Sequence, residues 1–457
     1  MNFVTLTYLV FLLIVVAGYW LMPRAPGRYW LIAASLVFYG SWNAWYVPGF
    51  VVLIVINWAL GNLAAGPHRR LAVGLAVITD LGLLAFFKYL DWVVASGSTL
   101  IERLTGVELG HSAFGLILPL AISFVTFTML AYVIDIARGA RPERKLSNFA
   151  LFVTFFPHLI AGPIMRGREF LPQVRHPRPL ASMHFRLALP LLVSGLVKKV
   201  IADSLAPSVA TTFADPSVAS TAGLWFGALA FAFQILFDFS GYTDLALGSA
   251  HLLGFKLPRN FDWPYRATSI QDFWRRWHMT LSRWLRDYVY IPLGGSRHGP
   301  ARMYLALITT MFLGGLWHGA GWTFVVWGLW HGAGLAVHRW FREGPSRWIH
   351  ISVVPAWAMT LTFAVVGWVF FRSESLETAL IYLGGMFQLR DGVSAVPGLV
   401  ATAVLIGVLL QWNVFAAFVG RLAPTGSLRQ YAGLGFALLA AVLFIPVVIP
   451  DFIYFQF

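Results

Sequence analysis

The chain alternates long apolar runs with short basic loops along most of its length. A helix needs about 20 apolar residues to cross a bilayer. Runs near this length lie at about 3–22, 29–44, 47–65, 71–95, 113–136, 184–205, 222–240, 351–371, 396–418 and 431–450. Of the 457 residues, 58% are hydrophobic and 11% are charged, whereas soluble domains carry about 25% charged residues. The pattern predicts an all-α polytopic membrane protein, with residues 1–457 forming one integral membrane domain.

The charged loops predict the orientation of the chain in the membrane. Basic residues follow the first, third and fifth apolar runs, at 24–28, 68–70 and 138–145. Because cytoplasmic loops are enriched in Lys and Arg, we expect both termini on the outer side of the membrane. Residues 3–22 lack the basic start and cleavage site of a signal peptide, which favours a first transmembrane helix. The net charge of +14 fits this topology, and we expect no nucleic-acid partner.

One apolar segment is not expected to span the membrane. Phe149–Ile164 is interrupted by Pro157 and Pro163, and basic residues flank it on both sides, at 144–145 and 166–168. A segment with two cytoplasmic ends is re-entrant, and its irregular backbone must be covered by protein or must line a water-filled cavity. His158 lies near its predicted tip.

The most informative residue is His318, which joins two apolar arms at about 303–317 and 322–338. Fifteen helical residues rise about 22 Å, and the hydrocarbon core is about 30 Å thick, so His318 is expected inside the membrane. An imidazole is costly there without hydrogen-bond partners, and its ordinary pKa lies near neutrality. Two interpretations stay open: His318 transfers protons, or it is a structural histidine bonded to a carbonyl.

A basic, Trp-rich stretch precedes these arms. On a helical wheel, residues 272–288 place their aromatic and Leu side chains on one arc and most arginines on the other. This pattern predicts one continuous interfacial helix, with His278 at the border of the two arcs. The arginines either snorkel to the membrane surface or bind the phosphates of a nucleotide-like acyl donor.

Several kinds of site are not expected. The chain has no cysteine, which excludes disulfides, thiolate zinc sites and a cysteinyl acyl-enzyme. His318 and His331 are thirteen residues apart with no Glu between them, so we expect no metal site. Asp238 and Asp244 are costly near the end of a predicted helix. They could orient a base, pair with the basic stretch or lie at the interface.

Several windows resemble the membrane-bound O-acyltransferase family, in its bacterial alginate O-acetylation branch. The resemblance covers about residues 110–340, and its windows are Phe155–Ile164, Phe237–Asp244, Asn260–Phe261 with Pro264–Tyr265, Trp274–Gly295, Gly315–Gly319, Trp327–Gly328 and His331–Gly332. It implies a ring of about 11 transmembrane helices with re-entrant segments and a central tunnel. By the same resemblance, His318 corresponds to the family's essential histidine and His278 to its second active-site position.

The resemblance also implies a function. We expect an O-acyltransferase that moves an acetyl group from cytoplasmic acetyl-CoA, a co-substrate rather than a bound cofactor, to an extracytoplasmic polysaccharide. The expected location is the bacterial inner membrane, with a periplasmic acetyltransferase partner protein. The residues assigned to substrate and donor binding are Trp274, Arg275, Arg276, Trp277, Arg283, Asp238 and Trp317.

Rival functions remain open at this point. D-alanyl or fatty-acyl transfer would use the same family machinery on other substrates. A transporter without chemistry would also place His and Asp within the membrane, although the sequence has no inverted repeat of the kind many transporters carry. The sequence does not choose among alginate, cellulose, peptidoglycan and other glycans.

Overall fold

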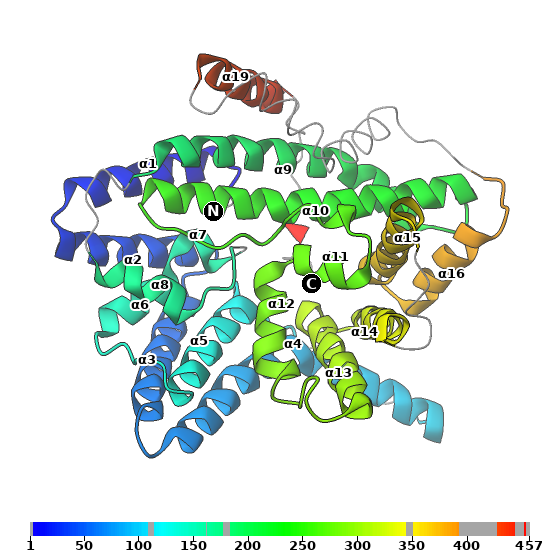
Figure 1. Cartoon of the computed structure of the whole chain (residues 1–457), viewed down its shortest axis with the longest axis horizontal. Helices are drawn as coiled ribbons and strands as arrows, with labels where there is room; N and C mark the ends of the chain where they lie inside the picture. The colour runs from blue at the N-terminus through cyan, green and yellow to red at the C-terminus, as the bar shows by residue number, and fades with distance from the viewer. Residues whose placement is uncertain are drawn as a thin grey trace. The chain divides into compact units, whose positions relative to one another are not determined.

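A computed structural model describes residues 3–107, 114–160, 162–176, 183–343, 351–392, 427–443 and 452–453. Regular secondary structure in these ranges is helical, as predicted (Figure 1). The span expected at 396–418 lies outside the described residues, as does the end of the final predicted helix. The described chain forms two compact units, one of residues 1–188 with 246–258 and one of residues 189–245 with 259–457.

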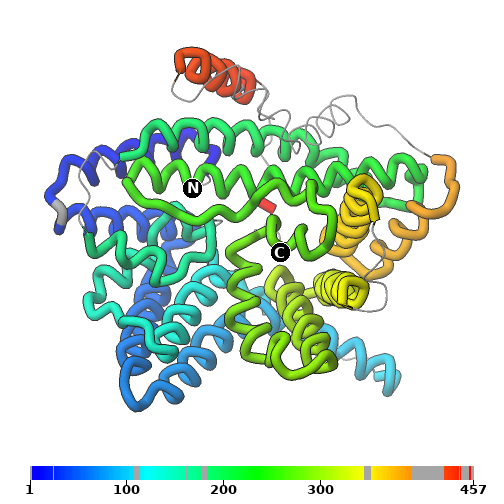
Figure 2. The backbone as a smooth tube through the Cα atoms, viewed as in Figure 1, coloured from blue at the N-terminus to red at the C-terminus, as the bar shows by residue number. Residues whose placement is uncertain are grey.

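The first unit holds the amino-terminal helices, coloured blue to cyan-green in Figure 2. They are α1 (Leu6–Leu21), α2 (Arg24–Gly40), α3 (Tyr46–Ala64), α4 (Arg69–Thr105), α5 (Ile122–Ala137), α6 (Leu146–Thr154), α7 (Phe156–Leu159) and α8 (Gly167–Arg175).

The second unit holds most of the two long helices α9 (Phe185–Ala214) and α10 (Thr221–Leu252) and the helices that follow them. These are η2 (Pro264–Arg266), α11 (Ile270–Arg276), α12 (Met279–Leu285), the π-helical turn η3 (Arg286–Tyr290), α13 (Pro300–His318), α14 (Trp322–Glu343), α15 (Val353–Arg372), α16 (Leu376–Phe387) and α19 (Leu428–Leu443). The short helix α16 was not expected from the sequence.

Four of the described helices are long and apolar enough to cross a membrane: α3, α4, α10 and α15. Helix α4 corrects the predicted boundary at residue 95, because its 37 residues run on to Thr105. At 1.5 Å per residue it is about 55 Å long, longer than a hydrocarbon core. Glu102 and Arg103, expected in a loop, therefore lie in its last turns, and Gly106 ends it with a φ of 71°.

Other predicted boundaries were wrong as well. The run expected to be helical from residue 113 becomes helical only at Ile122, after Ala121 takes a left-handed conformation with a φ of 59°. Helix α10 does not end near residue 240 but continues to Leu252. Asp238 and Asp244 are therefore within a helix rather than near its end. They are tolerated there because α9 runs antiparallel beside α10 and supplies Lys199 and Lys198 to them.

The segment 149–164 is broken and covered, as expected. Helices α6 and α7 meet at Phe155, where the backbone leaves helical geometry with a ψ of 104°. The described residues of this segment are buried except Ala150, which is half-buried, and the Phe156 N–H donates to the hydroxyl of Ser35 (3.1 Å). His158 Nε2 hydrogen-bonds the carbonyl of Phe152 (2.9 Å). Protein therefore covers the irregular backbone, which is the condition for such a segment within a membrane.

Candidate active site

The site is built on a tight helical hairpin of α13 and α14. Two glycines let the helices approach closely. A Cβ at Gly315 would lie 2.3 Å from the carbonyl oxygen of Phe324, and one at Gly328 would lie 2.5 Å from that of Met311. Such contacts are shorter than any van der Waals separation, so only hydrogen fits at both positions. The hairpin confirms the two arms predicted on either side of His318.

Gly328→Ala is expected to destabilise the protein by about 1–3 kcal/mol, because overpacking forces two backbones apart. Gly74→Ala is the matched control, since Gly74 also lies within a helix and nothing lies within 4 Å of its added Cβ. Thermal unfolding in detergent measures both variants. A Gly328→Ala protein that melted like Gly74→Ala would contradict the close packing.

His318 is the last residue of α13 and is only 4% exposed. Three aromatic rings surround its imidazole, with centroid distances of 4.9 Å to Trp317, 5.0 Å to Trp327 and 5.2 Å to Phe371. All three rings meet the imidazole edge to face. This enclosure holds His318 in an apolar setting, where its orientation is fixed by packing.

His278 was predicted on one continuous helix, and this prediction was wrong. Helix α11 ends at Arg276, and α12 begins at Met279. His278 lies between them with φ 39° and ψ 55°, in the left-handed region. The break carries the imidazole from the expected border of an amphipathic helix into the interior, where His278 is fully buried. The helical wheel drawn over 272–288 therefore does not apply beyond Arg276.

A loop residue holds this break in place. Asn260 accepts the N–H of Met279 on its carbonyl oxygen (2.8 Å) and the hydroxyl of Thr280 on its side-chain oxygen (2.6 Å). Asn260 is fully buried. Its two bonds satisfy groups at the start of α12, where the N–H groups lack helical partners. The family resemblance included Asn260, but no role was assigned to it from the sequence.

The two histidines come together. The ring centroids of His278 and His318 are 6.5 Å apart, and Trp317 lies beside both, at 5.7 Å from His278 and 4.9 Å from His318. Phe239 of α10 covers His278 from another side, at 4.7 Å. The spacing allows one small reacting group to contact both imidazoles. The sequence alone could not place residues forty positions apart beside each other.

The predicted donor-binding residues divide into two groups. Trp274 and Trp277 are buried in the aromatic packing around α11, with Trp277 4.8 Å from Trp368. Arg275 is exposed, Arg283 is half-buried, and Arg276 pairs with Asp272 (3.0 Å) and Asp262 (3.3 Å). The arginines therefore lie on the same short stretch as His278 but toward solvent.

Asp238 belongs to a buried ionic cluster between α9 and α10. Lys199 contacts Asp203 and Asp238, the latter at 2.8 Å, and each of the three side chains is at most 6% exposed. The other carboxylate oxygen of Asp238 accepts the N–H of Ile453 (2.8 Å). The neighbouring Phe452 packs on Tyr242 (4.1 Å). Asp238 thus holds Phe452 and Ile453 next to the helix that covers His278.

Sequence reasoning also undervalued His331. It is fully buried one helical turn beyond Trp327, with ring centroids 4.8 Å apart, and stacks parallel to Phe273 at 6.0 Å. Neither ring nitrogen of His331 has a hydrogen-bond partner within the described part of the chain. The i, i+4 spacing of Trp327 and His331 was the available signal. His331 was included in the family resemblance and its spacing to His318 was judged unsuited to a metal, but no role in the site was assigned to it from the sequence.

Comparison with known proteins identifies the family. The model of the membrane-bound O-acyltransferase family matches residues 143–371, which include both histidines of the site. The chain is 41% identical over 394 residues to the probable alginate O-acetylase AlgI of Azotobacter vinelandii, covering 84% of this chain and 77% of that protein. This chain belongs to the membrane-bound O-acyltransferase family.

Other relatives of this O-acyltransferase act on different polymers. It is 39% identical over 406 residues to the peptidoglycan O-acetyltransferase of Helicobacter pylori, covering 81% of this chain and 75% of that protein. It is 30% identical over 242 residues to the teichoic acid D-alanyltransferase of Streptococcus thermophilus, covering 49% of this chain and 58% of that one. The family resemblance drawn from the sequence windows is confirmed. The protein is a multi-pass membrane enzyme that transfers acyl groups to oxygen.

Proposed function

We propose that this enzyme transfers an acetyl group from cytoplasmic acetyl-CoA for the O-acetylation of an extracytoplasmic polysaccharide, with a periplasmic partner protein completing the transfer. The buried pair of His278 and His318 is the observation that carries the proposal. Relatives named as alginate and peptidoglycan O-acetylating proteins support the acetyl group and the class of acceptor.

His318 serves as the general base in this proposal. An acceptor hydroxyl attacks the acetyl carbon, the carbon–sulfur bond breaks, and His318 takes the hydroxyl proton and returns it to the leaving thiolate. Such acid–base catalysis contributes about 10²–10⁴-fold in rate. His278, 6.5 Å away between ring centroids, positions the acceptor or the acyl oxygen by hydrogen bonding.

Buried donors near this pair suit the amide-rich arm of the thioester. The indole N–H groups of Trp274, Trp327 and Trp368 are buried and have no partner among the described residues. Leaving each such group unsatisfied costs about 1–3 kcal/mol, so a ligand that bonds them is favoured. Exposed Arg275 and half-buried Arg283 lie close to His278 in the sequence. In this proposal their guanidinium groups bind the phosphates of acetyl-CoA.

The proposed setting is the bacterial inner membrane, with a ring of about 11 transmembrane helices around a tunnel and both termini in the periplasm. Because the chain has no cysteine, introduced thiols report its topology without background. We expect a membrane-impermeant maleimide to label Val218→Cys from the periplasm in intact cells, and to label Arg70→Cys only after lysis. Both positions are exposed. The reverse pattern would contradict the orientation.

The decisive experiment for the function incubates the purified enzyme with [¹⁴C]acetyl-CoA, D-alanyl carrier protein or palmitoyl-CoA as donor. Release of free thiol and the position of the label are followed with candidate glycans, with and without periplasmic extract. The proposal requires that the label from acetyl-CoA appears as an acetyl ester on an acceptor hydroxyl. Transfer only from one of the other donors, or movement of a solute without thioester loss, would reject the proposal.

A further inference from the structure

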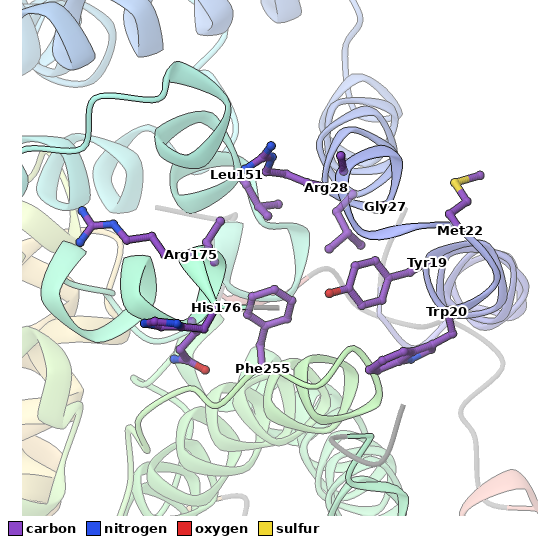
Figure 3. A pocket seen from close by; sticks show the side chains of 13 residues that line it. Tyr19, Trp20, Met22, Gly27, Arg28, Leu151, Arg175, His176 and Phe255 are labelled. Atoms are coloured by element: carbon purple, nitrogen blue, oxygen red, sulfur yellow. The ribbon is translucent and has the colours of Figure 1, made fainter. Parts of the chain in front are cut away.

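A cavity lies in the first unit, among residues that the proposed acetyl transfer does not use. Its volume is about 340 Å³, and it is bounded by the α1–α2 turn, α6, α8 and Phe255 (Figure 3). Four of its described lining residues carry rings, Tyr19, Trp20, His176 and Phe255, and two are arginines, Arg28 and Arg175. No Asp or Glu is among the described residues that line it.

Arg28 supplies a positive charge to this cavity, and no described residue forms an ion pair with it. Its Nη1 donates to the side-chain oxygen of Asn148, which is only 3% exposed. Its Nε is buried, with no hydrogen-bond partner in the described ranges of the chain. A neutral amide therefore fixes the guanidinium without cancelling its charge. Arg175 differs, because it pairs with Glu143 (2.7 Å) and its guanidinium is turned away from the aromatic rings in Figure 3.

The remaining walls are suited to an amphiphile. The rings of Tyr19 and Phe255 lie 6.5 Å apart between centroids, and Trp20 is fixed by a hydrogen bond from its indole N–H to the carbonyl of Leu252 (2.9 Å). Ala25 and Gly27, from the first turn of the 17-residue helix α2, also line the cavity. The amino-terminal end of a helix carries partial positive charge and favours an anion.

We propose that this cavity binds a phosphate ester of net negative charge that also carries an apolar or ring-bearing group. The phosphate is held by Arg28 near the start of α2, and the rest of the ligand lies against Tyr19, Trp20 and Phe255. Two sources share this chemistry: the headgroup of an anionic phospholipid and a soluble nucleotide. Basic pockets at the cytoplasmic ends of membrane helices are suited to an anionic phospholipid headgroup. An aromatic wall is suited to both the phospholipid and the nucleotide.

Native mass spectrometry of the purified full-length protein tests the proposal. The probes are dioctanoyl phosphatidylglycerol, dioctanoyl phosphatidylcholine and ADP. Arg28→Gln is expected to weaken binding of the preferred anionic probe by about 10- to 100-fold, because a hydrogen bond to a charged group is lost. Arg70→Gln makes the same charge change at an exposed position outside the cavity, and it should leave binding unchanged.

A second variant keeps Arg28 but cancels its charge. Asn148→Asp places a carboxylate where the amide now holds the guanidinium, and it should weaken binding by a similar factor. Arg28-dependent binding of phosphatidylglycerol over phosphatidylcholine identifies a lipid, and Arg28-dependent binding of ADP identifies a nucleotide. Equal binding of all probes by the wild type and both cavity variants would overturn the proposed site. So would a loss of affinity in Arg70→Gln as large as that in Arg28→Gln. No outcome depends on acetyl transfer.

Discussion

Replacing His318 by alanine is expected to lower the rate of acetyl transfer by about 10²–10⁴-fold, because the acceptor hydroxyl loses its general base. His318→Gln should lose as much, since an amide donates and accepts hydrogen bonds but does not take up a proton near neutral pH. The measurement is the initial rate of thiol release from acetyl-CoA by purified protein. His68→Ala, at an exposed position, is the control and should keep full activity.

The glutamine variant separates the two interpretations of this histidine. If His318 only held a neighbouring carbonyl in place, Gln would restore most of the activity that Ala removes. Added imidazole should rescue part of the rate of the Ala variant, because the space vacated in the aromatic cage admits a small base. Near wild-type activity in either variant would reject the assignment of His318 as the base.

Replacing Lys199 by methionine is expected to destabilise the fold by about 3–5 kcal/mol, because it leaves buried charge without its partner. Lys199 lies between the carboxylates of Asp203 and Asp238, which are 6% and 4% exposed. Lys198→Met is the matched control. Its pair with Asp244 is more exposed, at 27% and 18%, so the expected loss is about 1 kcal/mol or less.

A rescue variant tests the cause of this loss. The triple variant Lys199→Met, Asp203→Asn, Asp238→Asn removes all three buried charges and should recover much of the stability, since neutral replacements of buried ion clusters are often tolerated. Denaturant or thermal unfolding in detergent compares the variants. Equal midpoints for Lys199→Met and Lys198→Met would contradict a buried ionic anchor between α9 and α10.

The sequence predicted most helices but not where several of them end. An apolar run indicates a helix, because a helix buried in lipid or protein needs apolar side chains. The run does not show at which residues the helix begins and ends. Helix α4 extends past its apolar part, and α10 continues through two aspartates. The partners that make this possible, such as Lys199 on α9, come from another helix. A pattern read along one segment cannot show them.

The site was predicted in part. His318 and His278 were chosen from the sequence and its family resemblance, and the structure brings their rings together. The helical wheel failed at His278 because it assumes one uninterrupted backbone, whereas Asn260 holds a break there. Burial of His331 was hidden for a similar reason, because rings from α11 and α15 enclose it.

The left-handed backbone at His278 restricts which amino acids this position can accept. A φ of 39° suits Gly, and Asn, Asp and His adopt such values more readily than other side chains, whereas β-branched residues are strained there. Random replacement at this codon would therefore mix two defects, a missing imidazole and a distorted chain. Asparagine is the informative choice, since it preserves the turn while changing the chemistry. A residue at this position must first be able to adopt the left-handed backbone, and only then can its side chain meet the needs of catalysis.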